Sequence, residues 1–298
     1  MRYSIKKKLE EGIHAIFLAP AMVFILLLSV VPLVFAIYLS FQRYLLFMPI
    51  EMRYFNGLAN YISILTNQEF LSSIAWTIMF SFIATSFSVG IALFLSVLMA
   101  NVSQSRTVNL MKSILIIPMM IAPVVSSTMW QIMFGPIFGP INYVIEVLGG
   151  YAISWTGDPV AARAAIVIID TWGSIPFAML IFIGALTTIP NELYESASID
   201  GANRFTQFKN ITLPLMRNFI ALVLTLRVMD TLRIFDPIMI MTNGGPSGAT
   251  ESMGTMIYRI AFRYMNIGEG SAAAIIFFFV IAIVSIGVLF LTRKKEVS

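Results

Sequence analysis

The sequence predicts an all-α polytopic membrane protein with six transmembrane helices. The 298 residues are 58% hydrophobic and only 11% charged, whereas a soluble domain carries roughly a quarter charged residues. Six apolar runs are each long enough to cross about 30 Å of hydrocarbon. These runs span residues 13–38, 71–100, 113–134, 164–186, 215–241 and 271–291.

The distribution of Lys and Arg predicts which side of the membrane each loop faces. The side that holds the N-terminus carries 12 of these residues in its loops and at the ends of the spans, and the opposite side carries 5. The positive side is cytoplasmic. We therefore expect both termini to be cytoplasmic, with an N-terminal segment at 1–12 and a basic tail at 293–298. Between them lies a transmembrane domain at 13–292, with a cytoplasmic loop at about 188–214.

The first apolar run follows a basic head, a pattern shared by secretory signals and membrane anchors. The run is too long for a signal core and lacks a clear small-residue cleavage site, so we interpret it as an uncleaved anchor. The single His residue, His14, stands at its start, where an interfacial position is expected. The formal charge of +4 reflects basic residues at span ends rather than a nucleic-acid partner.

The sequence lacks the residues and motifs that several kinds of chemistry require. There is no Cys, which excludes disulfides and thiol chemistry. The phosphate-binding pattern GxxxxGK[ST], the zinc pattern HExxH and the nucleophile pattern GxSxG are also missing. We therefore expect no catalytic residue, no metal and no bound cofactor in this chain.

The polar stretch at 192–218 is predicted to form two short helices joined at a glycine. Asn191 is placed to cap the first helix. Gly201 suits the left-handed conformation that ends it, and Asn203 is placed to cap the second. Pro214 is expected to close the second helix and open the next span.

This stretch carries small and aromatic residues that suit close contact with another surface. Ser196, Ala197 and Ala202 are small. Phe205 and Phe208 share a helix face through their i,i+3 spacing and are placed to fill a partner's groove. Two interpretations stay open from these residues alone: a docking site, or an amphipathic loop that lies among lipid headgroups.

The run from Glu195 to Pro214 closely resembles the EAA motif found in the membrane subunits of bacterial ABC importers. The matching residues are Glu195, Ala197, Asp200, Gly201, Ala202, Phe208, Ile211, Leu213 and Pro214. Ser196 stands where the family has Ala, and Asn218 stands where the family often has Pro. The stretches IDTWGSIPF and FDPIMIMTNGGPSGATE resemble the carbohydrate-importing branch, of the first-permease type, whose type member is the maltose permease pair.

The resemblance implies a type I ABC importer permease fold in a bacterial or archaeal cytoplasmic membrane. It implies a coupling helix that contacts a cytoplasmic ATPase dimer, which uses ATP and Mg. It also implies a second six-span permease, an extracytoplasmic solute-binding protein and a sugar substrate. The ATPase-coupling residues implied are Glu195, Ser196, Ala197, Asp200, Gly201, Ala202, Phe205, Phe208, Leu213 and Pro214.

Charged residues inside spans are costly and therefore indicate function. Arg227, Asp230, Arg233 and Asp236 follow one another at intervals of three in the fifth apolar run. Arg227 and Asp230 lie near mid-depth, where both solute contact and ion pairing stay open. For Arg233 and Asp236, toward the outer end, a structural ion ladder between helices is favoured.

Asp170 and Trp172 in the fourth run form a second candidate pair for solute contact. A carboxylate accepts hydrogen bonds from sugar hydroxyls, and an indole face packs on a pyranose ring. The alternative is that Trp172 packs between helices and Asp170 is a paired core charge. Trp76 and Trp130 are expected to be packing or interfacial residues.

Other functions remain possible from the sequence. An ion-coupled secondary transporter would use Asp170 and Asp230 as carriers but leaves the polar stretch unexplained. A membrane scaffold or assembly factor would require no transport at all. An ABC importer permease for polyols or glycerol phosphate would share the same motif, and the sequence does not reveal which solute is carried.

Overall fold

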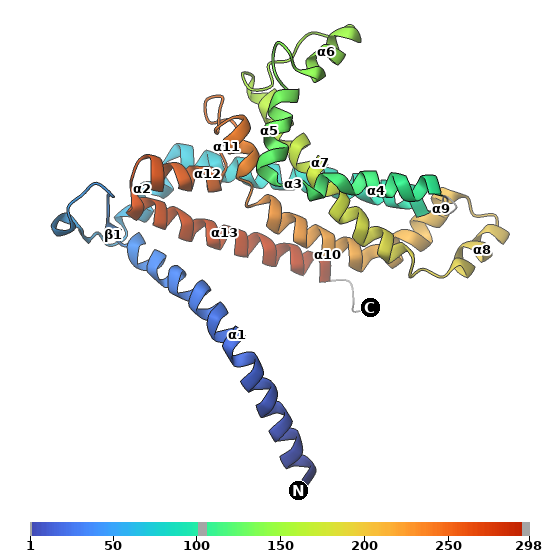
Figure 1. The fold of residues 1–298 in the computed structure, drawn as a ribbon, viewed down its shortest axis with the longest axis horizontal. Helices are drawn as coiled ribbons and strands as arrows, with labels where there is room; N and C mark the ends of the chain where they lie inside the picture. The colour runs from blue at the N-terminus through green and yellow to red at the C-terminus, as the bar shows by residue number, and fades with distance from the viewer. Residues whose placement is uncertain (1, 101–105, 294–298) are drawn as a thin grey trace. The chain divides into compact units, whose positions relative to one another are not determined.

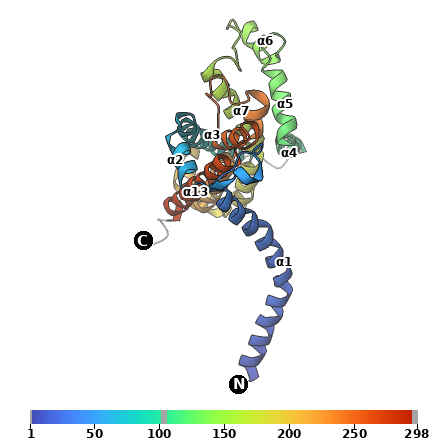
Figure 2. The same ribbon diagram turned by 90° about the vertical axis from the view of Figure 1, so that its left-hand side faces the viewer.

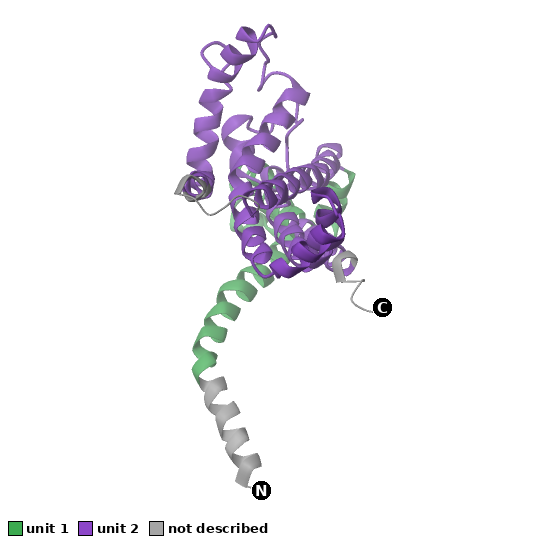
Figure 3. Ribbon diagram, turned by 90° about the vertical axis from the view of Figure 1, so that its right-hand side faces the viewer, with its two compact units in different colours: residues 1–66, 257–276 green, residues 67–256, 277–298 purple. Residues whose placement is uncertain are grey.

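The computed structural model describes residues 2–100 and 106–293. It divides into two units, residues 1–66 with 257–276 and residues 67–256 with 277–298 (Figure 3). Within the described residues, five helices are long and apolar enough to cross a membrane, or six if one bent pair counts as a single span. The all-α class is confirmed. The predicted basic tail at 293–298 lies, apart from residue 293, outside the described residues.

The first unit combines one long helix with a small hairpin. Its elements are α1 (Arg2–Ser40), β1 (Gln42–Arg43), η1 (Ile50–Met52), β2 (Tyr54–Phe55), α2 (Ala59–Thr66), η3 (Arg259–Arg263) and the first turns of α13 (Ile267–Arg293). The strands pair antiparallel, with Gln42 opposite Phe55. The buried Asn60 amide donates to the carbonyl oxygens of Ser40 and Gln42, at 2.8 and 2.9 Å. Asn60 therefore ties the end of α1 to the hairpin.

The second unit is a helical bundle centred on α3 and α7, with α10 packed against both (Figures 1 and 2). Its elements are α3 (Gln68–Ala100), α4 (Arg106–Met120), α5 (Pro123–Met133), α6 (Pro140–Val147), α7 (Pro159–Leu186), α8 (Asn191–Ile199), α9 (Arg204–Gln207), η2 (Phe208–Thr212), α10 (Leu213–Thr231) and α11 (Asp236–Met241). Helix α12 (Met253–Tyr258) runs on into the first unit. The buried face of α3 is rich in Ser, Thr and Ala, and small residues let membrane helices approach closely.

Two clusters of buried apolar residues hold this bundle together. One gathers around Trp76 and Phe80 of α3 and Ile166 and Ile169 of α7. The other includes Phe182 of α7 and is completed by residues of α3 and α10. Large apolar side chains elsewhere on the spans remain exposed in the isolated chain, as expected of helices whose solvent is hydrocarbon.

The third apolar run, predicted as a span at 113–134, is broken into two helices. Helix α4 ends at Met120, α5 begins at Pro123, and the two are bent by 105°. The residue before a proline is pushed out of the helical region. Ala122 accordingly has φ −58° and ψ 139°. Pro123 therefore starts a new helix in a new direction.

The fifth run is broken as well, so the predicted span at 215–241 was too long. Helix α10 ends at Thr231, and α11 starts at Asp236 with Pro237 in its first turn. Pro237 has no N–H with which to continue the α10 hydrogen-bond ladder. The Ser252 hydroxyl donates at 3.0 Å to the carbonyl of Ile234, within the break. The Ser252 side chain thus supplies a hydrogen-bond donor to a backbone carbonyl that the break leaves outside a helix.

Helices α3, α7 and α13 begin a few residues before the predicted spans because a polar side chain just ahead of each helix caps its first turn. Asn67 accepts hydrogen bonds from the backbone N–H groups of Glu69 and Phe70 at the start of α3. Asp158 caps α7 by accepting from Val160 and Ala161. A hydropathy pattern locates the apolar part of a span, whereas capping side chains determine where its helix begins.

Candidate functional site

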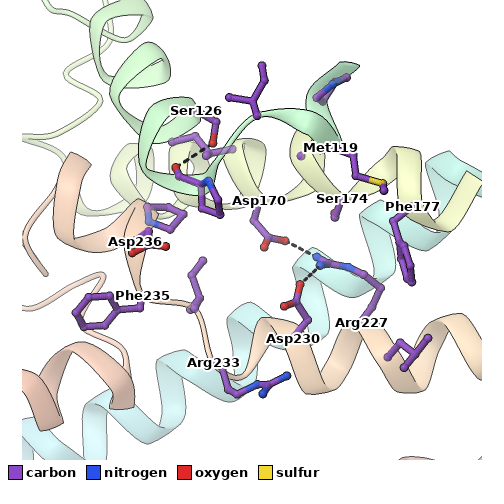
Figure 4. A pocket seen from close by; sticks show the side chains of 18 residues that line it. Met119, Ser126, Asp170, Ser174, Phe177, Arg227, Asp230, Arg233, Phe235 and Asp236 are labelled. Atoms are coloured by element: carbon purple, nitrogen blue, oxygen red, sulfur yellow. Dashed lines mark hydrogen bonds and ion pairs between the residues drawn. The ribbon is translucent and has the colours of Figure 1, made fainter. Parts of the chain in front are cut away.

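A cavity of about 610 Å³ lies in the second unit, where both helix breaks meet the middle of α7 (Figure 4). This volume falls within the range of small-molecule sites. Non-helical backbone at membrane depth is tolerated where it lines such a cavity. The lining residues are Pro118, Met119, Ile121, Pro123, Ser126, Ile169, Asp170, Gly173, Ser174, Phe177, Leu226, Arg227, Asp230, Arg233, Ile234, Phe235, Asp236 and Pro237.

Arg227 lies at the centre of the cavity's charged wall. Its Nη2 donates to Asp170 Oδ2 at 2.5 Å, and its Nη1 donates to Asp230 Oδ2 at 2.6 Å. Its Nε donates to the buried Ser88 hydroxyl at 3.2 Å. The guanidinium therefore links α10 to α7 and to α3, and it has no freedom to reorient without losing several charge-assisted hydrogen bonds.

The two carboxylates that Arg227 contacts differ in exposure. The Asp170 side chain is 14% exposed, whereas the Asp230 side chain is 67% exposed. Asp230 therefore retains acceptor capacity toward the cavity, since an ionised carboxylate accepts at about four positions. The ion pair expected of Arg227 and Asp230 is present, and both residues also line the cavity. Solute contact by this pair stays a prediction.

Trp172 occupies a different position from its predicted partner Asp170. Its ring lies edge-on to Trp130, with 5.7 Å between ring centroids, and it is not among the residues that line the cavity. Trp76 is a packing residue, as expected: it is 4% exposed, and the Arg163 guanidinium lies 4.9 Å from its ring centroid.

Arg233 and Asp236 do not form the ion ladder that was favoured for them. Within the described part of the chain, neither takes part in an ion pair. Arg233 Nε donates to the carbonyl of Met229 at 3.0 Å. The break after α10 is the physical reason, because it removes the helical spacing on which the prediction relied. Both residues instead line the cavity.

The polar stretch forms the predicted pair of short helices, α8 and α9, around Gly201. Gly201 has φ +80°, the left-handed conformation predicted for it. Asn203 Oδ1 accepts from the Thr206 N–H at 2.8 Å, which confirms the predicted cap. The prediction for Asn191 was wrong: Pro190 occupies the capping position with extended backbone, and Asn191 is the first helical residue.

Pro214 does not close the second helix. The chain runs from α9 through the wide turn η2 directly into α10. The Leu213 N–H donates to the carbonyl of Phe208, five residues earlier. A turn of this width is a π turn, and such turns are frequent at functional sites. The η2 turn accommodates a proline that has no N–H and would crowd the preceding carbonyl of a regular helix.

Most of the motif lies on the surface. No residue of α8 or α9 is buried, and Phe205 is 73% exposed. The exposed set comprises Glu195, Ser196, Asp200, Gly201, Phe205, Leu213 and Pro214, and the partly buried set comprises Ala197, Ala202 and Phe208. This surface is therefore exposed in the isolated chain, and docking of another protein on it stays a prediction.

Sequence reasoning missed four residues that form hydrogen bonds beside the cavity or within the motif region: Ser88, Tyr194, Gln207 and Thr212. Each contributes a hydrogen bond between elements. No local pattern marks a Ser in an apolar helix or a Tyr in a polar one as a contact residue. Among the described residues, no group of three or more His, Asp or Glu side chains is arranged to hold a metal ion.

The helical bundle, with broken spans around a cavity whose wall carries Asp170, Arg227 and Asp230, defines a membrane permease. A family model described as "Binding-protein-dependent transport system inner membrane component" matches residues 92–295. The chain therefore belongs to this family. The match includes both the cavity and the Glu195–Pro214 motif, and the resemblance to the permeases of carbohydrate ABC importers is confirmed.

Named relatives are transport permeases rather than enzymes. The trehalose/maltose transport system permease protein MalF of Thermococcus litoralis is 35% identical over 272 residues, which cover 90% of each chain. The probable starch degradation products transport system permease protein AmyD of Thermoanaerobacterium thermosulfurigenes is 28% identical over 293 residues, 98% of each.

One solved structure shares the fold over nearly the whole length. It is a bacterial alginate ABC transporter in complex with an alginate pentasaccharide-bound periplasmic protein. The TM-score is 0.85 at 20% identity, with 98% of each chain covered.

Proposed function

We propose that the chain is the membrane-spanning permease subunit of an ATP-driven sugar importer and forms half of a translocation pathway by alternating access. The observation that carries this proposal is one continuous helical segment. The second half of the exposed motif starts this segment at Arg204, and the segment continues through η2 and α10 past Arg227 in the cavity wall. Part of the docking surface and one wall of the solute cavity therefore lie on the same helical segment.

The proposed topology has six spans and cytoplasmic termini. The bent pair of α4 and α5 counts as the third crossing, and the lysine and arginine distribution orients the chain. The host membrane is a bacterial or archaeal cytoplasmic membrane. In this arrangement α8 and α9 face the cytoplasm.

The proposed partners follow from the docking surface and from the family. A cytoplasmic ATPase dimer binds ATP and Mg and contacts α8 and α9, while this chain catalyses no reaction. A second six-span permease completes the pathway. An extracytoplasmic solute-binding protein delivers the sugar, as the family description and the name of the alginate complex suggest.

Within the cavity, Asp230 is the proposed solute-contacting carboxylate, because it is exposed and retains free acceptor positions. Arg227 and Asp170 orient it and stabilise the wall. The Arg233 side chain also lines the cavity and supplies donors to hydroxyl oxygens. Trp172 stays a predicted solute contact that would require movement of its ring away from Trp130.

The decisive experiment reconstitutes this chain in proteoliposomes with its ATPase, its partner permease and its binding protein. The expected result is uptake of a carbohydrate that requires ATP and survives a proton uncoupler. Uptake without ATP, abolished by the uncoupler, would instead support an ion-coupled transporter. A solute panel of mono-, di- and oligosaccharides, polyols and glycerol phosphate would identify the substrate class.

A further inference from the structure

Tyr194 is the point at which α8 attaches to the bundle. Helix α8 has no buried residue, and the Tyr194 ring is half-buried against the apolar cluster that contains Met216. Its hydroxyl lies 2.9 Å from the hydroxyl of Thr212, which is 4% exposed in the η2 turn. The Tyr194 side chain of α8 therefore reaches the turn that directly precedes α10.

A second set of hydrogen bonds holds α9 against α8. Gln207 Nε2 donates to Ser198 Oγ at 2.8 Å and to the carbonyl of Ala202 at 3.2 Å. Ser198 Oγ in turn donates to the carbonyl of Tyr194 at 2.8 Å. These bonds fix the angle between two helices that Gly201 would otherwise leave free to vary.

We infer that Tyr194 and Thr212 form a positioning clamp that transmits displacement of α8 to α10. This inference rests on the proposed function. Apolar packing of the ring is non-directional, whereas the bond between the two hydroxyls holds α8 at one position along η2. Without that bond, α8 would keep its contact with α9 through Ser198 and Gln207 but would lose its hydrogen bond to η2.

The clamp connects directly to the cavity. Thr212 precedes α10, and Arg227 lies 15 residues further along the same helical segment, about 22 Å by helical rise. Arg227 joins α10 to Asp170 in α7. A displacement delivered at Thr212 therefore reaches two helices that line the cavity.

The test uses the fully reconstituted importer and four variants: Tyr194→Phe, Thr212→Val, the double variant and Thr212→Ser. The expected result for the first two is a roughly threefold to tenfold loss in solute transported per ATP hydrolysed, the size of one partly buried hydrogen bond. The double variant should lose no more than either single variant, because both remove the same bond. Thr212→Ser retains the hydroxyl and should retain the wild-type ratio.

A matched control, Tyr143→Phe, removes the hydroxyl of an exposed residue on α6 and should change nothing. Binding of the ATPase to the clamp variants should stay within about twofold of wild type. Three results would each overturn the clamp. The first is an unchanged ratio of solute transported to ATP hydrolysed in Tyr194→Phe. The others are losses that multiply in the double variant, or equal losses of ATPase binding and uptake. Absence of ATP-driven uptake in the wild type would instead overturn the proposed function, and the clamp with it.

Discussion

Arg227 and Asp170 form an ion pair at 2.5 Å between α10 and α7, across 57 residues of sequence. The Arg227 side chain is 3% exposed and the Asp170 side chain 14%. A single charge at membrane depth is costly, so each residue is tolerated because the other neutralises it. The pair therefore sets the distance between two walls of the cavity.

Replacing Arg227 with Met should destabilise the protein by about 3 kcal/mol, because the Asp170 carboxylate loses its cation and stays buried. Thermal unfolding of the purified chain in detergent would measure the change. Transport should fall as well, since Arg227 also holds Asp230 at 2.6 Å.

The control for this prediction is the double variant Arg227→Met with Asp170→Asn. Removing both charges should restore most of the lost stability, because no unpaired charge remains. If the losses of the two single variants simply add in the double variant, the two residues are not energetically coupled and the prediction is wrong.

Asp230→Asn should affect transport more than stability. Its side chain is 67% exposed, and exposed ion pairs contribute at most about 1 kcal/mol. Losing a charged acceptor for a sugar hydroxyl should raise the half-saturation concentration of uptake about tenfold. The matched control is Glu146→Gln on α6, an exposed acid outside the cavity. Equal uptake by the two variants would exclude Asp230 as a solute contact.

Gly201→Val should weaken ATPase binding by about tenfold through backbone strain, since the left-handed conformation costs an L-residue about 1–2 kcal/mol. A Cβ at Gly201 would meet nothing within 4 Å, so the effect comes from φ +80° rather than from a clash. Gly201→Asn is the control, because Asn tolerates this conformation. The amount of ATPase that each variant retains in a pull-down measures the difference. Equal binding by the Val and Asn variants would refute the strain argument.

The proposed topology can be tested with single cysteines, because the chain contains none. A membrane-impermeant maleimide applied to intact spheroplasts should label Tyr151→Cys in the outer loop, where Tyr151 is 92% exposed. Glu192→Cys and Ser298→Cys should be labelled only after permeabilisation. Labelling of either one in intact cells would contradict the six-span arrangement with cytoplasmic ends.

Asn142→Leu should loosen the segment between α6 and α7. Asn142 donates to the carbonyl of Ile153 at 3.0 Å and accepts from the Trp155 indole N–H at 2.9 Å. Without the amide these buried groups lose their partner, at a cost of about 2 kcal/mol. In a background where the other three Trp residues are replaced by Phe, acrylamide should then quench the fluorescence of Trp155 more strongly than in the same background with Asn142. Asn142→Asp, which keeps the acceptor, should show a smaller change, and identical quenching in all three proteins would rule out this role.

The local features of this protein could be predicted from its sequence because neighbouring residues determine them. Composition and run length are sufficient to predict a helical membrane protein. The left-handed turn at Gly201 and the cap at Asn203 depend on one side chain and its own backbone. The motif from Glu195 to Pro214 identified the family for the same reason, since its residues are contiguous.

Only the tertiary structure decided how distant residues combine into a site. The pairing of Arg227 with Asp170, the contact of Tyr194 with Thr212 and the position of Trp172 against Trp130 each depend on how helices pack. The breaks at Ala122 and after Thr231 were missed because apolar composition continues across them, while proline and neighbouring polar groups redirect the backbone. Hydrophobicity selects the segments that enter the membrane, but it is non-directional and does not determine how they are arranged. The cavity exists because hydrogen bonds and ion pairs select one arrangement of those segments.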